Sequence, residues 1–457
     1  MKPSRVQQVL VVLISHNCVA PLSGETPEHD NLYSINVDTV LHRLRYPRFL
    51  LHTKQHMGAV HECLLMELLE HGRARDAQCF EAAESKLPKK PKRNVLESAF
   101  QELVEGRFVE RVPAGYQGVV DDDEGDVDMD GDGIDSSDRN KKTSSTSRSD
   151  LFHKNADDLW RVNSNEFNRR FRHVACAALV KEKVDESAGH LLITMLELSR
   201  VHEQSVNEER STPVSEMEIL NQIIKNPHEF GFDVEHAKVT LEKMANDTSE
   251  LISVIDDDGH DVEHDVGDVG HDTIGVGQKT YCVNMRRIID LIRMKEIEAV
   301  VRERFGGPAC RIFRLLIMKR NLEQKQIAEM AMIPVKDTRE LLYKLLKAEY
   351  VQIQEVARTS DHAPSRTFYL WRVDLLRVVE QVGRELYRAT SNLRARLIHE
   401  LSSEKETLML LERAQDKTTV PLTSGQRANL VRMRQIATTL ESSVQRLDEL
   451  ICFFAVW

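Results

Sequence analysis

The spacing of apolar residues is typical of helices along most of the chain, and short alternating stretches follow several of these helices. The clearest case lies in 305–373, where the pattern predicts three helices and then two strands: Ala309–Arg320, Gln324–Met330, Pro334–Ala348, Tyr350–Val356 and Thr367–Val373. Pro334 suits the first turn of a helix, where its missing N–H costs nothing. Three short helices followed by a strand pair form a helix-turn-helix with a wing, so this segment is predicted to be a winged-helix module.

The same order of elements recurs at intervals of roughly 70–100 residues, which indicates four structural repeats without clear internal identity. We expect Tyr46–Pro47 to stop one helix and Gly106 to end another, as a glycine at a helix C-terminus commonly does. The first repeat starts at its third helix, so we expect its two earlier helices to be missing. The expected domains are a partial first winged helix at 1–45, a second at 46–117, a disordered linker at 118–149, a third at 150–304 and a fourth at 305–373.

The last segment, 374–457, has the pattern of two paired helices. The first is predicted to run from Asp374 to about Gln415, and the second resumes after a break at Lys417–Gly425. Apolar residues of the second helix repeat in steps of three and four, as in a coiled coil: Leu430, Met433, Ala437, Leu440, Val444, Leu447 and Ile451. The predicted fold class is therefore mainly α with small β-hairpins, built from tandem winged-helix domains followed by a C-terminal antiparallel helical hairpin.

Charge is distributed unevenly along the chain. The formal net charge is -11, but residues 121–138 hold 10 acidic and no basic residues, and 256–272 hold 8 acidic and no basic residues. Without those 18 acidic residues the balance changes from -11 to +7. The packed part of the chain is therefore mildly basic, which permits contact with nucleic acid or an acidic partner, although a solubility role explains such a surplus as well.

The cysteines and the apolar content exclude two classes of protein. The seven cysteines show no CxxC spacing, so we expect reduced thiols in the cytosol or nucleus. The strongly apolar stretch Val9–Ile14 is too short to span a bilayer, and it lacks a small-residue cleavage site. The sequence therefore predicts neither a membrane protein nor a secreted one.

Two acidic segments superficially resemble metal sites. Asp128, Asp130 and Asp132 fit the start of a calcium-binding loop, but Arg139 stands where a bidentate glutamate is required. His260 and His264 have the spacing of metal ligands on a helix, yet the glycines around them and the lack of a supporting scaffold favour a flexible insertion at 256–272. No phosphate-binding loop, nucleophile elbow or HExxH motif occurs. We therefore predict no catalytic residue, no cofactor and no metal.

Two groups of basic residues are candidates for contacts with DNA or a partner protein. The run KLPKKPKR at 86–93 has the composition of a nuclear import signal or a phosphate contact, and equally of a solvated loop; its candidates are Lys89, Lys90, Lys92 and Arg93. The second group lies on the third helix and the wing of the last module, the elements with which winged helices touch DNA: Lys336, Arg339, Lys344, Arg358 and Arg366. Glu340, Glu349 and Glu355 place negative charges among these basic residues. The mixture argues against base-specific contacts, and a protein-protein role agrees with it at least as well as DNA contact does.

The segment 303–373 closely resembles the third-largest, winged-helix subunit of eukaryotic DNA-directed RNA polymerase III. The pieces that carry this resemblance are RFG (304–306), RIFRL (311–315), EQKQ (323–326), AMIP (331–334) and DHAPSRTFYLW (361–371). Weaker similarity covers LHRLRYPRFL (41–50) and WRVNSNEFNRRFR (160–172). The resemblance implies two earlier helices in the first module, which we expect to be missing from this sequence, and the insertion at 256–272 is not part of the family's pattern.

The resemblance implies a non-catalytic subunit of RNA polymerase III that acts in the nucleus. It implies attachment to the clamp region of the polymerase core, assembly with two other subunits into an initiation subcomplex, and promoter opening with TFIIIB at small non-coding RNA genes such as those of tRNA and 5S rRNA. Contact with promoter DNA would be largely non-specific, through phosphates. The alternatives are a free-standing winged-helix transcription factor and, from the Asp and His clusters alone, an enzyme.

Overall fold

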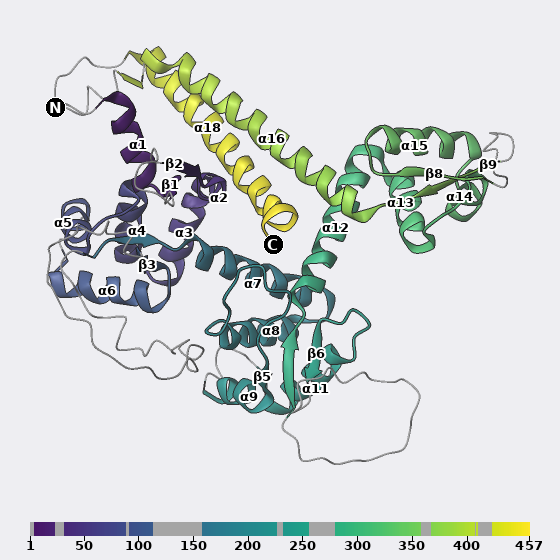
Figure 1. Cartoon of the computed structure of the whole chain (residues 1–457), viewed down its shortest axis with the longest axis horizontal. Coiled ribbons are helices and arrows are strands. Elements are labelled where there is room, and N and C mark those ends of the chain that lie inside the picture. The colour runs from purple at the N-terminus through teal and green to yellow at the C-terminus, as the bar shows by residue number, and fades with distance from the viewer. Residues whose placement is uncertain are drawn as a thin grey trace, which may run out of the picture. The chain divides into compact units, whose positions relative to one another are not determined.

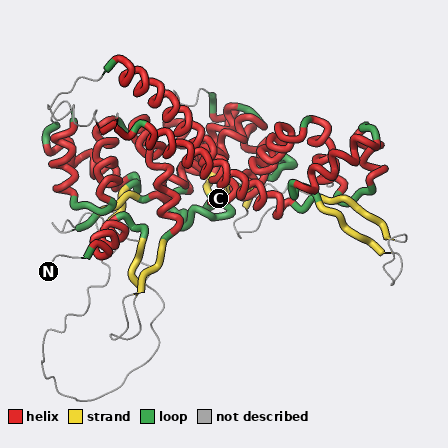
Figure 2. Tube along the Cα trace, turned by 90° about the horizontal axis from the view of Figure 1, so that it is seen from above, coloured by secondary structure: helices red, strands yellow, loops and turns green. Residues whose placement is uncertain are grey.

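Helices dominate the computed structural model of the chain (Figures 1 and 2). The structure describes residues 4–22, 32–87, 91–112, 158–225, 232–255, 279–357, 367–406, 408–409 and 423–457. Strands in these residues form small antiparallel sheets of two or three strands, so the prediction of a mainly helical chain with small β-hairpins is confirmed. The chain divides into two compact units, Met1–Phe167 and Asn168–Trp457. The predicted linker at 118–149 and the acidic insertion at 256–272 lie outside the described residues.

The described part of the first unit consists of short helices and two small antiparallel sheets. Its elements are α1 (Arg5–Ser15), β1 (Val19–Leu22), β2 (Leu32–Ile35), α2 (Val37–His42), the 3₁₀ turn η1 (Arg43–Arg45), α3 (Tyr46–His56), α4 (Ala59–His71), α5 (Asp76–Lys86), α6 (Arg93–Glu105), β3 (Val109–Arg111) and β4 (Trp160–Val162). Ser4 and Gln7 form a capping box at the start of α1, which satisfies backbone N–H groups that the first helical turn leaves unpaired. The unit's core lies among α3, α4, α5 and α6, with Phe49, Leu64 and Leu103 fully buried.

Of two local predictions in this unit, the first is wrong and the second is confirmed. Tyr46–Pro47 does not end the helical segment; Tyr46 begins α3 with Pro47 in its first turn, a position where proline is tolerated as readily as after a helix end. The prediction that Gly106 ends a helix is confirmed: α6 ends at Glu105 and Gly106 caps it with φ -71°, while the residue in the left-handed conformation is Arg107. A Cβ at Gly106 would approach the Phe108 ring to 2.9 Å. The glycine is therefore suited to close packing of that ring.

The strand β3 pairs with β4, a strand that the apolar pattern does not predict. Val109 lies opposite Val162, and Arg111 lies opposite Trp160. The Trp160 ring meets Phe100 edge-on at 5.4 Å, and Trp160 also forms a bridge with Ala74. The expected boundaries at 117 and 150 therefore separate two strands that belong to one sheet, because the partner strand lies beyond the predicted linker.

The second unit begins within α7 (Ser164–Lys183) and first builds a core around a three-stranded sheet. Its elements are α8 (Glu186–Ser199), β5 (Val214–Ser215), α9 (Glu216–Lys225), α11 (Val234–Ala245), β6 (Ile252–Ile255) and β7 (Thr280–Val283), with strand order β5-β7-β6. We call residues 168–292 the third module. Helix α8 begins at Glu186, because the Asp185 carboxylate accepts the Ala188 N–H at 2.7 Å and caps the helix.

A buried ion cluster ties α7 to the segment after α8. The Glu203 carboxylate is fully buried, with Arg169 Nε at 2.8 Å, Arg172 Nη2 at 3.4 Å and His173 Nε2 at 3.1 Å. Arg172 also donates to the carbonyl oxygens of Val206 and Glu208. The cluster fixes an irregular segment whose backbone would otherwise lack regular partners.

The fourth module, residues 305–373, follows the predicted order of three helices and a strand pair. Its elements are α13 (Gly307–Lys319), α14 (Gln324–Ala331), α15 (Val335–Lys347), β8 (Gln352–Ala357) and β9 (Thr367–Arg372). Phe313, Leu342 and Tyr350 are among the side chains that fill its core. Figure 2 shows the β8–β9 pair extending away from these helices.

Three long helices complete the second unit: α12 (Met285–Phe305), α16 (Leu375–Ser403) and α18 (Ser424–Ile451), which ends in the π-helical turn η4 (Cys452–Val456). Helix α12 contributes Ile288 to the third-module core and Val301 to the fourth-module core. Helices α16 and α18 lie side by side (Figure 1), and the start of α16 packs near the end of α18, where Leu386 and Ile451 share the fourth-module core.

Candidate nucleic-acid interface

Helix α15 carries a row of basic and aromatic side chains on one side. Lys336, Arg339, Tyr343 and Lys347 are spaced by three and four residues, so they share one face of the helix, and all four are exposed. The Arg339 guanidinium lies 6.0 Å from the centre of the Tyr343 ring, and that ring is 50% exposed. We call these four residues the basic face of α15. It combines charges that attract phosphate with a flat ring on which a guanidinium or a base can rest.

The Tyr343 ring packs against the wing strand β9. It meets the Trp371 ring edge-on at 5.7 Å, and Trp371 is 4% exposed. The backbone N–H of Trp371 donates to the Leu322 carbonyl at 2.8 Å, which joins β9 to the turn before α14. Trp371 therefore anchors β9 to the helices and supports the Tyr343 ring on the basic face of α15.

The other predicted residues of this module have different surroundings. Lys344 lies on a neighbouring side of α15, and its ammonium is 2.8 Å from the Glu340 carboxylate. The hydrogen bond from Lys344 holds the pKa of Glu340 below its ordinary value, so the two charges compensate each other at neutral pH. Arg358 and Arg366 lie outside the described residues. The structure thus brings Lys336 and Arg339 together with Tyr343 and Lys347, two residues that the predicted site did not include.

The second predicted basic group lies before α6 in the first unit. Lys89 and Lys90 lie outside the described residues, and Lys92 is exposed at the start of the helix. Arg93 pairs with Glu97 at 3.4 Å, and its guanidinium lies 5.6 Å from the centre of the Phe80 ring. Arg93 is therefore already engaged with its own module.

Lys86, the first basic residue of the same run, has a structural partner. Its ammonium lies 2.7 Å from the buried Glu67 carboxylate and 2.8 Å from Glu70, and hydrogen bonds to these two carboxylates raise the pKa of Lys86. Charge composition alone could not separate this lysine from its neighbours.

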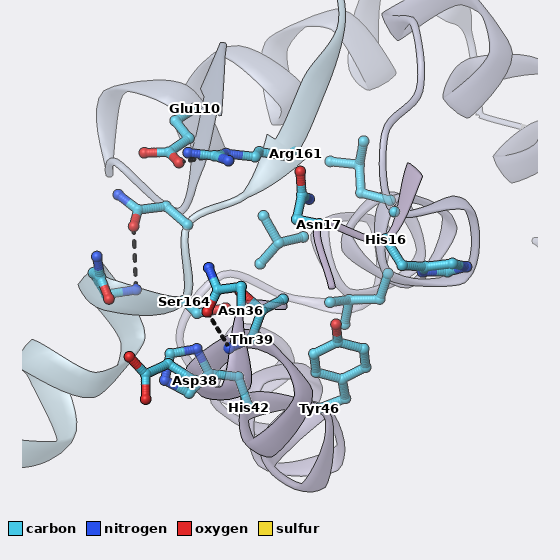
Figure 3. Close-up of a pocket in the computed structure, with 16 residues that line it drawn as sticks. His16, Asn17, Asn36, Asp38, Thr39, His42, Tyr46, Glu110, Arg161 and Ser164 are labelled. Atoms are coloured by element: carbon cyan, nitrogen blue, oxygen red, sulfur yellow. Dashed lines mark hydrogen bonds and ion pairs between the residues drawn. The ribbon is translucent and has the colours of Figure 1, made fainter. Parts of the chain in front are cut away.

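A polar cleft of about 230 Å³ lies in the first unit (Figure 3). Asn36 accepts the Thr39 N–H at 3.1 Å, which caps α2, and Arg161 donates to the Glu110 carboxylate at 2.7 Å. Burial, and to a smaller extent Arg45, lower the pKa of His42 to about 4, so this imidazole is neutral at pH 7. The cleft therefore lacks the surplus of positive charge that distinguishes the basic face of α15.

Sequence patterns gave no signal for this cleft, because its walls come from separate segments of the chain: 16–17, 36–46, 68–72, 110 and 161–165. Within the described residues, no group of three or more His, Cys, Asp or Glu side chains is arranged to hold a metal ion. The described helices include none that is both long and apolar enough to cross a membrane. The predicted metal-like histidines, His260 and His264, lie outside the described residues.

Comparison with known proteins gives a consistent result for two separate segments. Residues 297–373 match the family model described as POLR3C, C-terminal winged-helix domain, and residues 121–230 match the model described as RNA polymerase III subunit RPC82. The first match contains α13 to β9, so the fourth module is a winged-helix domain.

Similarity to individual proteins extends over nearly the whole chain. The chain is 29% identical over 446 residues to DNA-directed RNA polymerase III subunit RPC3 of Danio rerio, covering 90% of this chain and 78% of that protein. The proteins of the same name from Rattus norvegicus and Homo sapiens are 27% and 26% identical, each over 97% of this chain and 86% of the relative.

Proposed function

The chain belongs to the RPC3 family of DNA-directed RNA polymerase III subunits, and from this premise we propose that it is a non-catalytic subunit that acts in transcription initiation. It joins two other subunits in an initiation subcomplex in the nucleus, attaches to the clamp region of the polymerase core and assists promoter opening with TFIIIB. The observation that carries the proposal is the similarity to RPC3 proteins over 97% of the chain. Promoters of small non-coding RNA genes, such as those of tRNA and 5S rRNA, are the proposed targets.

The proposed architecture assigns one role to each segment. Residues 1–45 belong to a first winged helix, 46–117 to the second, and the third and fourth occupy 150–304 and 305–373, followed by a helical hairpin at 374–457. The pairing of β3 with β4 supports one revision, in which the second winged helix also includes Trp160–Val162. Under this proposal the modules supply binding surfaces, and the hairpin packs on the cores of its neighbours.

We propose that the subunit acts only by binding the polymerase, its partner subunits and promoter DNA, without a catalytic step of its own. The third helix of each module is the element that a winged helix presents to DNA, and these helices differ in charge. Helix α6 has one basic and three acidic residues, α11 has two of each, and α15 has four basic and two acidic residues. We therefore propose that α15 holds promoter phosphates without reading bases, because Lys and Arg contacts to phosphates carry no sequence information.

Affinity purification of the tagged full-length chain from the organism of its origin tests the family assignment. We expect the catalytic subunits of RNA polymerase III to co-purify in stoichiometric amounts. Recovery of the chain without any of them would overturn the proposal.

The proposed role in initiation has a separate test. Polymerase depleted of the chain should lose transcription from a closed promoter while it still extends RNA on a pre-opened bubble or a tailed template, because binding energy for opening is then not needed. Equal losses on both templates would contradict a role in initiation and favour a general structural role.

The basic face of α15 also favours a second candidate, a free-standing winged-helix transcription factor. That function requires the isolated chain to discriminate one duplex from random competitor by a factor of roughly 10³ or more. A salt-titrated binding assay of the isolated chain measures this ratio directly. We expect little discrimination, since Glu340 and Asp337 interrupt the positive surface of the helix.

A further inference from the structure

The helix pair α16–α18 has an uneven distribution of charge along its length. The start of α16 packs near the end of α18, so the two helices run antiparallel. We call residues 387–403 of α16 and 424–440 of α18 the distal part of the pair. The distal part holds six arginines, no lysine and one acidic residue, whereas 375–386 and 441–451 hold three arginines and five acidic residues. Positive charge is therefore concentrated in the distal part.

Most of these distal arginines are not neutralised by a carboxylate. Arg396 pairs with Glu400, the acidic residue of the distal part. Within the described residues, no ion pair or hydrogen bond engages the side chains of the other five arginines, and all five are exposed: Arg388, Arg394, Arg427, Arg432 and Arg434. Near the start of α16, by contrast, Arg377 lies 3.6 Å from Asp374 and Arg384 lies 3.2 Å from Glu349. Unpaired positive charge is thus a property of the distal part.

Three of the unpaired arginines lie on one side of the helix pair. Leu393 and Met433 belong to the seam where the two helices meet, and Met433 is buried. Arg394 directly follows Leu393, and Arg434 directly follows Met433. One step after the seam leads to the same side on both helices, because antiparallel helices of the same hand turn toward it. Arg427 stands seven residues before Arg434, on the same face and roughly 10 Å along the axis. We call Arg394, Arg427 and Arg434 the arginine row.

The surroundings of the arginine row indicate what kind of partner it fits. The core of a protein interface is apolar and depleted of charge, but the large side chains more than half exposed in the distal part are two aliphatic ones among arginines, Ile398 at 62% and Val431 at 58%. Arg432 extends the positive charge to the other side of α18, since it precedes the seam residue Met433. A nucleic-acid backbone needs only distributed positive charge, and a guanidinium matches the geometry of a phosphate.

We propose that the arginine row binds the phosphate backbone of nucleic acid and does so without reading bases. The proposed function assigns phosphate contact to the basic face of α15, and the arginine row is a second contact formed by a different part of the chain. Each contact releases counterions from the nucleic acid, so the salt dependence of binding by the whole chain contains a contribution from each.

Binding of the purified full-length chain to a mixed-sequence DNA duplex, measured over a range of salt concentrations, tests the row. Arg394→Gln with Arg434→Gln should lower the slope of log affinity against log salt by about 2, because two phosphate contacts are lost. The matched control Arg377→Gln with Arg384→Gln removes the same charge from arginines that face carboxylates, and its slope should equal that of wild type. Equal slopes for the two variants would overturn the proposal.

A charge-conserving variant separates loss of contact from loss of structure. Arg394→Lys with Arg434→Lys should keep the slope within about 0.5 of wild type, since each lysine still neutralises one phosphate. A slope as low as that of the glutamine variant would contradict phosphate binding. Ile398→Ala with Val431→Ala should leave the affinity within about twofold of wild type, because a phosphate backbone offers these side chains no apolar partner. A tenfold loss would instead make an apolar protein surface the occupant.

Photo-crosslinking identifies the occupant in the assembled polymerase on a promoter template. Benzoylphenylalanine is placed at position 431, between Arg427 and Arg434, and the background is taken from position 376, where Leu376 is 79% exposed outside the distal part. We expect an adduct with nucleic acid at a yield several times the background. An adduct mainly with another polypeptide, or a yield at background, would overturn the inference. Failure of the polymerase to co-purify contradicts the proposed function instead, because the salt slopes are measured on the isolated chain.

Discussion

Helices α11 and α15 occupy the same position in their modules, yet they use their charged residues differently. On α11 the charges are taken up by the module itself: Lys238 pairs with Glu235 at 3.4 Å, Lys243 with Asp185 at 3.0 Å and Glu242 with Lys279 at 3.1 Å. On α15 the charges of Lys336, Arg339 and Lys347 stand on an exposed face beside Tyr343. The charged residues at the same position in a module therefore pair within the module in one case and are left on an exposed face in the other.

The two modules differ in their interiors as well. The third module places Arg169, Arg172, His173 and Glu203 together, nearly excluded from solvent, whereas the described core of the fourth module is formed mainly by apolar side chains such as Phe313 and Leu342. Burying an ion cluster costs desolvation that close geometry must offset. The third module should therefore depend on charge for stability and the fourth on packing.

The largest effect we expect is from Glu203→Gln. The substitution leaves Arg169 and Arg172 buried without their carboxylate, and breaking a buried ion pair in this way costs about 3–5 kcal/mol of unfolding free energy. Hydrogen exchange of the full chain measures the effect in each module, and α8 should lose protection while α13 keeps it. The matched control Glu242→Gln removes an exposed partner and should cost less than about 1 kcal/mol. A similar loss of protection in both modules would show that the ion cluster does not stabilise the third module alone.

Acid should affect the third module before the fourth. Burial lowers the pKa of His173, although Glu203 opposes this shift; burial raises the pKa of Glu203, but His173 and the two arginines outweigh it and leave that pKa lowered. Both groups are thus more acidic when folded, so their stabilisation is present above the unfolded pKa values, about 6.5 and 4.3, and is lost as pH falls.

The experiment is hydrogen exchange between about pH 7 and pH 4, corrected for the intrinsic exchange rate. Helix α8 should lose protection as the pH falls, and Glu203→Gln should flatten the part of this dependence that belongs to the carboxylate. Parallel pH profiles for α8 and α13 would contradict the contrast between a charged interior and an apolar one.

A smaller effect is expected when the basic face of α15 is neutralised. Lys336→Gln with Arg339→Gln should weaken binding of the assembled polymerase to promoter DNA and lower the slope of log affinity against log salt by about 2. Lys238→Gln with Lys243→Gln on α11 is the matched control and should leave the slope unchanged, because those lysines face carboxylates of their own module. Equal slopes for the two variants would remove the functional contrast between α11 and α15.

The sequence predicts local elements well where apolar spacing and helix ends agree. The predicted helices Gln324–Met330 and Pro334–Ala348 agree to within one residue at each end with α14 and α15. Trp160–Val162 is not predicted, because a three-residue strand has no periodicity of its own and its partner Val109–Arg111 lies across the predicted linker. Pairing over such a distance is decided by the packing of Trp160 on Phe100, which no local pattern records.

The sequence predicted that basic residues of this helix form a candidate site, but it did not predict which residues make up the exposed face. Helical spacing places Lys336 and Arg339 on one helix, and their positive charge makes them candidates for contact with DNA or a partner protein. The pattern could not show that Lys344 is compensated by Glu340, or that Tyr343 completes the exposed face. Which basic residue remains available depends on partners brought together by folding, and these partners include residues far away in the sequence, as Glu67 does for Lys86.

The smallest effect is expected from the basic run before α6. Lys92→Gln with Arg93→Gln should change the salt slope of promoter binding by less than the pair on α15, because Arg93 already pairs with Glu97 and rests on Phe80, and the remaining charges of α6 are acidic. Loss of the intrahelical pair should lower the stability of α6 by about 0.2–0.5 kcal/mol, which thermal unfolding of the Arg93→Gln single variant measures. A slope change as large as that of Lys336→Gln with Arg339→Gln would instead make the second module a phosphate-binding partner equal to the fourth. Charge surplus on the third helix would then not decide which modules hold DNA.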